Sequence, residues 1–127
     1  MKDIFKLIPA SYIYSINGRD NILIRDVLSY LQYTYGPQIT KDKLCGAIAL
    51  EGFRSRGHVA LRFTDENEPT SSRAWTRSNP KVDTTAVERQ RAYTREEIIK
   101  NHADKVIKYI QSIKEGKGRT VFVKQGN

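Results

Sequence analysis

The arginines of this chain are concentrated in one segment. Eight of the eleven lie between Arg54 and Arg95, whereas ten of the eleven lysines lie outside that stretch. A guanidinium group is planar and carries several donors, so it pairs bidentately with phosphate and stacks on rings. This segregation indicates a surface that holds an anion, and nucleic acid is the anion that it favours.

Residue types that commonly carry out catalysis are few and scattered. His58 and His102 are the two histidines, and the single Cys45 excludes an internal disulfide or a cysteine-rich zinc site. His102 and Asp104, two positions apart on a predicted helix, point to different faces. The carboxylates form no recognisable nuclease spacing, and no glycine-rich loop precedes a helix. We therefore expect no catalytic residue, no metal site and no cofactor.

Length and charge limit the remaining classes. The 127 residues suit a single domain, 1–127, and the net charge of +8 favours a polyanionic partner. No apolar run is long enough for a signal peptide or a membrane span, so we expect an intracellular, cytoplasmic protein without a membrane partner.

The first elements are predicted from local signals. Asp3 can cap a short helical turn that Pro9 ends. Residues 11–16 are β-branched and aromatic, which predicts a strand, and Asn17-Gly18 predicts a turn after it.

Two helices are predicted next. The first begins at Asp20 or Asn21 and ends at Tyr35, before Gly36-Pro37. Its buried stripe is predicted to consist of Ile24, Val27, Leu28, Leu31 and Tyr35. The second helix runs from an N-cap at Thr40 to about Glu51, and Lys41 and Lys43 project from its first turn.

A β-hairpin is predicted after these helices. Residues 58–63 and 73–77 form its strands, and Arg73, Trp75 and Arg77 share one face. Two interpretations of Trp75 are open. It grips a nucleic-acid backbone together with its neighbouring arginines, or it caps the core while the arginines point outward.

The order helix, Gly-Pro turn, helix and hairpin resembles a winged helix-turn-helix domain over residues 20–77, with Leu44 to Arg56 as the junction between recognition helix and wing. The resemblance implies that the second helix enters the major groove and that the hairpin holds phosphates. Because the loop at 64–69 is acidic, contacts are expected at the base of the hairpin. The predicted nucleic-acid-binding residues are Thr40, Lys41, Lys43, Arg54, Arg56, Arg62, Arg73, Trp75 and Arg77.

The last third of the chain divides into an arm and a helical segment. Residues 78–93 lack periodicity and predict an extended arm that orders on a partner, with Arg89, Arg91 and Arg95 as possible partner-binding residues. Residues 94–127 start with the capping box Thr94–Glu97, which opens a helix ending at Gly116.

The stripe of that helix, Ile99, Ala103, Val106, Ile110 and Ile113, follows 4-3 spacing. It predicts either a core face or the contact surface of a homodimer. A closing strand is predicted at 120–124.

The sequence thus predicts an α+β fold with a winged-helix-like helical pair, a small antiparallel sheet, and an additional C-terminal helix and strand. The function that it favours is non-enzymatic binding of nucleic acid, with duplex DNA favoured over RNA. Two alternatives are open: a small accessory or inhibitory protein that binds a larger protein or nucleoprotein complex, and an RNA-binding or ribosome-associated protein.

Overall fold

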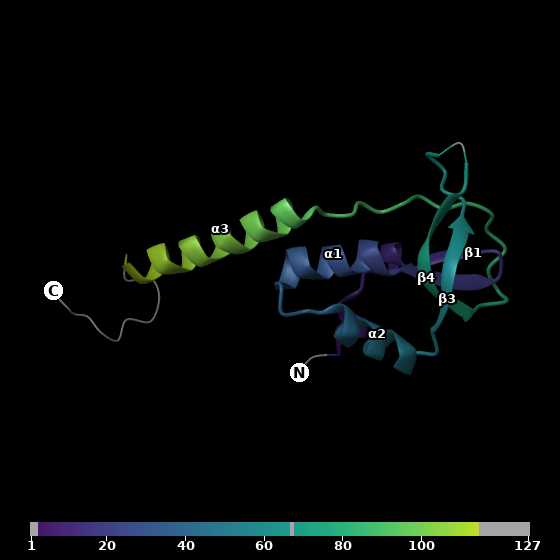
Figure 1. Ribbon diagram of the computed structural model, residues 1–127, viewed down its shortest axis with the longest axis horizontal. Helices are drawn as coiled ribbons and strands as arrows, with labels where there is room; N and C mark the ends of the chain where they lie inside the picture. The colour runs from purple at the N-terminus through teal and green to yellow at the C-terminus, as the bar shows by residue number, and fades with distance from the viewer. Residues whose placement is uncertain (1–2, 67, 115–127) are drawn as a thin grey trace.

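In the part of the chain that the structure describes, a four-stranded antiparallel sheet and three α-helices confirm the α+β class (Figure 1). The computed structural model describes residues 3–66 and 68–114. The strands lie in the order β1-β2-β4-β3. Two 3-10 turns precede them. The elements are η1 (Ile4–Leu7), η2 (Ala10–Tyr12), β1 (Tyr14–Ile16), β2 (Arg19–Leu23), α1 (Ile24–Tyr35), α2 (Lys41–Leu50), β3 (Arg54–Leu61), β4 (Thr70–Ser78) and α3 (Arg95–Lys114).

The first hairpin corrects the predicted start of the first helix. Asn17 and Gly18 have φ angles of 51° and 80°, so the predicted turn is confirmed and it joins β1 to β2. Asp20 and Asn21 do not cap a helix. Asp20 accepts hydrogen bonds from side chains near both neighbouring strands, and the Asn21 amide donates to the Tyr14 carbonyl at 2.9 Å. Residues 19–23 are therefore strand, and α1 begins only at Ile24. The strand predicted at 11–16 is shortened to β1, because η2 occupies its first part.

One hydrophobic core lies between the sheet and the helices on one of its faces. Val27 and Leu31 of α1 and Leu44 and Ile48 of α2 are fully buried against Phe53 and the strand residue Ile22. Burying one such aliphatic side chain is worth about 1.5–3 kcal/mol. Ile24, Val27 and Leu31 of the predicted stripe of α1 are buried and Leu28 is half-buried, but Tyr35 is 42% exposed.

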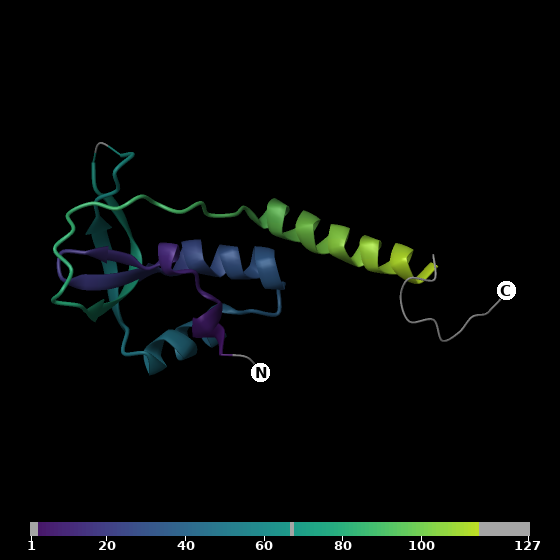
Figure 2. The same cartoon turned by 180° about the vertical axis from the view of Figure 1, so that it is seen from behind.

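A second, smaller core lies on the opposite face of the sheet. Tyr14, Leu23, Leu61, Phe63 and Ala74 are buried there, with Ile16 beside them. The extended chain at 79–94, which we call the strap, crosses this face (Figure 2).

The strap is held by the domain itself. Val87 forms a parallel bridge with Phe63, with backbone hydrogen bonds from Thr64 to Val87 and from Val87 to Arg62. The Asn17 amide donates to the Thr84 carbonyl at 2.8 Å. The predicted extended conformation is confirmed and these contacts are intramolecular, while the ordering of this segment on a partner stays a prediction.

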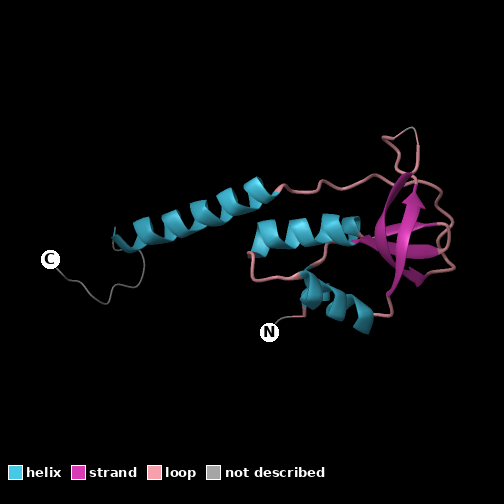
Figure 3. Ribbon diagram, in the orientation of Figure 1, coloured by secondary structure: helices cyan, strands magenta, loops and turns pink. Residues whose placement is uncertain are grey.

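The predicted capping box of α3 is confirmed, and the predicted role of its stripe in the core is not. The Glu97 amide donates to Thr94 Oγ1 at 3.1 Å, and the Thr94 amide donates to Glu97 Oε1 at 2.9 Å. Ile99, Val106 and Ile110 are 57%, 44% and 45% exposed. Figure 3 shows why: the far half of α3 extends beyond the rest of the domain.

Contacts with α1 hold the near half of α3. The rings of Tyr33 and Tyr93 stack at 4.1 Å between centroids, Asn101 donates to the Tyr33 carbonyl, and Lys105 donates to the Thr34 carbonyl. The predicted helix end at Gly116 and the predicted strand at 120–124 lie outside the described residues.

Candidate nucleic-acid interface

Several of the clustered arginines hold the fold together. The Arg77 guanidinium donates to Asp20 Oδ2 at 3.2 Å and to the Glu51 carbonyl at 2.9 Å, and it lies 4.4 Å from the centroid of the Phe53 ring. It therefore ties the C-terminal end of α2 to β2. Arg54 donates to the Ala49 and Phe53 carbonyls and satisfies acceptors at the same helix end.

Asp20 is the acceptor that makes the Arg77 contact strong. Burial raises the pKa of its carboxyl, but hydrogen bonds from Asn79, Ser15 and Arg77 outweigh burial and hold the pKa below its usual 3.8. Asp20 is thus ionised at neutral pH, and it engages Arg77 before any ligand arrives.

The arginines predicted to bind a partner through the strap are also engaged. Arg89 donates from Nε and Nη2 to the two oxygens of the fully buried Asp26, each at 3.2 Å. Arg91 pairs with Glu97 of the capping box. Of the three, Arg95 is exposed and makes no side-chain hydrogen bond or ion pair within the described chain.

Trp75 and the start of α2 also have structural roles. Trp75 is half-buried and packs against the core under α1 and α2, so it caps the core as one of the two interpretations predicted. Thr40 Oγ1 accepts from the Lys43 amide, which confirms the predicted N-cap, and Lys43 Nζ donates to the Gln38 carbonyl at 3.4 Å.

Six of the cations without a partner in the described chain line two cavities. The first, which we call the helix-side cavity, has a volume of about 530 Å³ and lies among the start of α1, Lys41 of α2 and the β3–β4 hairpin. No carboxylate of the described chain lines it. Of its permanent cations, Arg89 is paired with Asp26, whereas the side chains of Arg25, Lys41 and Arg73 make no hydrogen bond or ion pair within residues 3–66 and 68–114. The full lining is Ile24, Arg25, Leu28, Lys41, His58, Ser71, Ser72, Arg73 and Arg89.

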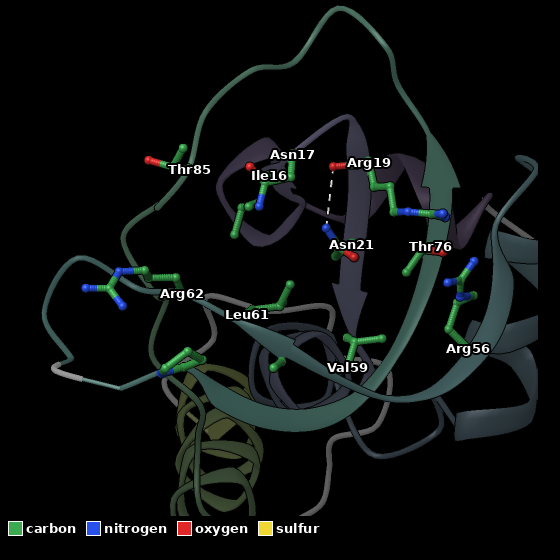
Figure 4. Close-up of a pocket in the computed structure, with 12 residues that line it drawn as sticks. Ile16, Asn17, Arg19, Asn21, Arg56, Val59, Leu61, Arg62, Thr76 and Thr85 are labelled. Carbon is green, nitrogen blue, oxygen red and sulfur yellow. Dashed lines mark hydrogen bonds between the residues drawn. The ribbon is translucent and has the colours of Figure 1, made fainter.

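The second cavity, the sheet-face cavity, has a volume of about 490 Å³ (Figure 4). Arg19, Arg56 and Arg62 line it, and it too has no carboxylate among the described residues. In Figure 4, Arg19 and Arg56 lie near Thr76, while Arg62 lies at the other end, on the same side as Thr85. None of the three guanidinium groups has a partner within the part of the chain that the structure describes.

The predicted site is therefore divided rather than continuous. Lys41 and Arg73 come together in the helix-side cavity, and Arg56 and Arg62 come together in the sheet-face cavity. Arg19, Arg25 and His58 were missed. The signal for Arg25 was available, because it falls off the apolar stripe of its helix. Sequence reasoning does not place Arg19 in the site, because residues 19–23 form a strand where a helix start is predicted.

Groups suited to other chemistry do not converge. Cys45 is a half-buried free thiol that packs against the helical core, and burial raises its pKa. Among the described residues, no group of three or more His, Cys, Asp or Glu side chains could hold a metal ion. No helix in the described ranges is long and apolar enough to cross a membrane.

Comparison of the chain with protein-family models, curated protein sequences and solved structures found no match in any of the three.

Proposed function

We propose that this protein binds nucleic acid, duplex DNA in particular, by phosphate contacts in the helix-side cavity. The observation that carries the proposal is an excess of positive charge in a concave site: Arg25, Lys41 and Arg73 line one cavity and, within the described residues, have no ion-pair partner and no carboxylate that lines the cavity with them. Cations held close together repel one another, so an anion that enters between them is stabilised. A phosphodiester backbone supplies such anions at regular spacing.

The position of α2 adds to this attraction. Lys41 is the first residue of α2, so the cavity lies next to the positive end of that helix's dipole. Ser71, Ser72 and His58 supply further groups that can hydrogen-bond to phosphate oxygens. Phosphate contacts give affinity and orientation, so the proposed binding has little dependence on base sequence.

Duplex DNA is favoured over unpaired RNA because no Phe, Tyr or Trp ring of the described chain lines either cavity. Tyr12 contacts Tyr30 at 5.0 Å between ring centroids, Tyr33 stacks on Tyr93, and Trp75 packs on the core. Recognition of unpaired bases depends on rings that are free to stack.

The test is a salt titration of binding to a short duplex of mixed sequence, followed by fluorescence anisotropy. The variant Arg25→Gln/Lys41→Gln/Arg73→Gln removes three charges that have no partner in the described chain. Each lost phosphate contact lowers the slope of log K against log salt by about 0.9, so the slope is expected to fall by roughly 2.7.

A matched control removes the same charge elsewhere. Lys6, Lys81 and Lys108 are exposed and lie outside both cavities. Their replacement by glutamine is expected to change the slope of log K against log salt by no more than about 0.9, the change for one phosphate contact. Equal losses in the two variants would show that only net charge matters and would refute the assignment of the site. Absence of binding at low salt would refute the function.

The exposed face of α3 favours a second candidate function, that of an accessory protein on a larger complex. Ile99, Val106, Ile107, Tyr109 and Ile110 are exposed large apolar side chains along one helix. Residues 95–114 carry five basic and three acidic side chains, so a second copy would bring like net charges together, whereas an acidic amphipathic helix would complement this face.

Light scattering of the purified protein distinguishes these occupants. We expect the purified protein to be a monomer that binds an acidic partner in a stoichiometric complex. The variant Val106→Asp/Ile110→Asp is expected to lose this partner. A stable dimer that the same substitutions dissociate would instead assign the face to a homodimer.

A further inference from the structure

We propose that the sheet-face cavity is a second phosphate-binding site, so that one chain holds two nucleic-acid segments at once. This inference rests on the proposed function and extends it from binding to bridging. It starts from Arg19, Arg56 and Arg62, three guanidinium groups around one cavity with no carboxylate lining it and no partner in the described chain.

The floor of this cavity suits a phosphodiester chain. Val59 is half-buried and provides apolar surface on which a sugar can pack, while Leu61, Asn21 and Thr76 line the cavity as nearly buried side chains. The cations come from three different elements: Arg19 from β2, Arg56 from β3, and Arg62 from the chain just after β3. Their common location is therefore a product of the fold.

The two cavities lie on opposite faces of the sheet. Side chains alternate between faces along a strand. His58 pairs with Arg73 in the β3–β4 ladder, and both line the helix-side cavity. Val59 and Leu61, which alternate with His58, line the sheet-face cavity, and Ala60 and Arg62 line it as well, so this cavity also reaches the edge of β3. The two hydrophobic cores confirm the division, because Trp75 packs under the helices while Leu61 and Ala74 belong to the core on the other face.

Because the two sites lie on opposite faces, we do not expect one straight duplex to reach both. DNA is stiff, with a persistence length of about 150 base pairs, so it does not fold around the edge of a sheet within one turn. At the two cavities, residues from other elements flank the β3–β4 hairpin. We therefore do not expect the hairpin alone to insert into a groove of DNA. Arg25 and Lys41 of the helices line the cavity on one face, and Thr85 of the strap lines the cavity on the other. Two separate segments, one on each face, satisfy both sites.

Native mass spectrometry and a bead assay together test the inference. With duplexes of roughly one helical turn, about 10–12 base pairs, the expected complex is one chain with two duplexes. In the bead assay, a tethered duplex retains the protein, and the protein then captures a labelled second segment from solution. The labelled segment is offered in parallel as duplex and as single strand, to identify which form of phosphodiester the second site accepts.

The variant Arg19→Gln/Arg56→Gln/Arg62→Gln is expected to retain binding of one duplex and to lose capture of the second. These side chains make no contact that the described fold needs, and circular dichroism checks that the fold is intact. Arg25→Gln/Lys41→Gln/Arg73→Gln is expected to lose capture as well, because bridging requires both sites.

Different failures have different meanings. A wild-type complex limited to one duplex, with no capture of either labelled form, would overturn the bridging inference and leave the proposed function standing. A complex of two chains with two duplexes would overturn it too, because dimerisation would then explain the capture. No binding of nucleic acid by the wild type would overturn the proposed function itself.

Discussion

The pair formed by Arg89 and Asp26 fastens the strap to α1, and its removal is expected to destabilise the whole fold. Asp26 is fully buried and accepts three hydrogen bonds, two from Arg89 and one from the Tyr14 hydroxyl at 3.1 Å. Arg89→Met keeps most of the apolar stem of the side chain and removes both charged donors. The carboxylate of Asp26 is then buried with one donor left.

The expected loss can be estimated from this geometry. Removing one partner of a buried ion pair costs about 3–5 kcal/mol, since the remaining charge stays desolvated. Arg89 is a quarter exposed, so water can reach part of the site, and we expect a value near the lower end, about 3 kcal/mol. That is roughly a hundredfold change or more in the unfolding equilibrium. Small domains are stable by only about 5–15 kcal/mol, so the effect is large.

Urea denaturation at neutral pH, followed by circular dichroism, measures the free energy of unfolding. Lys100→Met is the matched control, because it breaks the exposed pair between Lys100 and Asp104 and is expected to cost less than about 0.5 kcal/mol. The double variant Asp26→Asn/Arg89→Met removes the stranded charge and is expected to recover part of the loss. A loss below about 1 kcal/mol for Arg89→Met, or a double variant less stable than Arg89→Met alone, would refute the reasoning.

Three other predictions concern local contacts. Burial raises the pKa of Tyr12 to about 12. The resulting stability is present below pH 10 and is lost as the pH rises toward 12, so absorbance at alkaline pH should show delayed ionisation that disappears in urea. The pKa of Asp20 lies below 3.8, so its contribution to the free energy of unfolding is present above that pH and is lost as the pH falls further. Asp20→Asn should therefore weaken the dependence of stability on pH in this acidic range. Thr94→Ala is expected to cost about 1 kcal/mol and to speed amide exchange in the first turn of α3, whereas unchanged exchange would contradict a role for the cap.

Elements with short-range signals were predicted well. The turn at Asn17-Gly18, the N-cap at Thr40 and the capping box of α3 each depend on residues within a few positions of one another, and all three are confirmed. The start of α1 was predicted wrongly because it depends on residues far away in the sequence. Asp20 looks like a helix cap locally, but its partners Arg77 and Asn79 lie 57 and 59 positions away. That pairing, together with the β2–β4 ladder, makes residues 19–23 a strand.

The periodicity of α3 shows the limit of pattern alone. The alternating spacing of Ile99, Val106 and Ile110 correctly indicated one apolar face on a helix. Whether that face is buried depends on where the helix lies, and the contacts of Asn101 and Lys105 with the end of α1 hold only the near part against the domain. No local feature of the sequence specifies that placement.

The arginine cluster illustrates why residue type alone does not define a binding site. The planar fork that suits arginine to phosphate suits it equally to carboxylates and carbonyls of its own chain. Arg77 and Arg89 therefore satisfy the buried or nearly buried Asp20 and Asp26, and Arg54 satisfies carbonyls at a helix end. Clustering along the sequence reflects this internal use as well as any external partner.

The cations available to a ligand are those that remain after the fold's own acceptors are satisfied. Two of them, Arg19 and Arg25, lie outside the arginine-rich segment, and the fold brings them to cavities that also contain Arg56, Arg62 and Arg73. Because no carboxylate of the described chain lines either cavity, we infer that each cavity can hold an external anion. Two sets on opposite faces of one sheet would each require such an anion, and this is the physical basis for expecting two nucleic-acid segments on one chain.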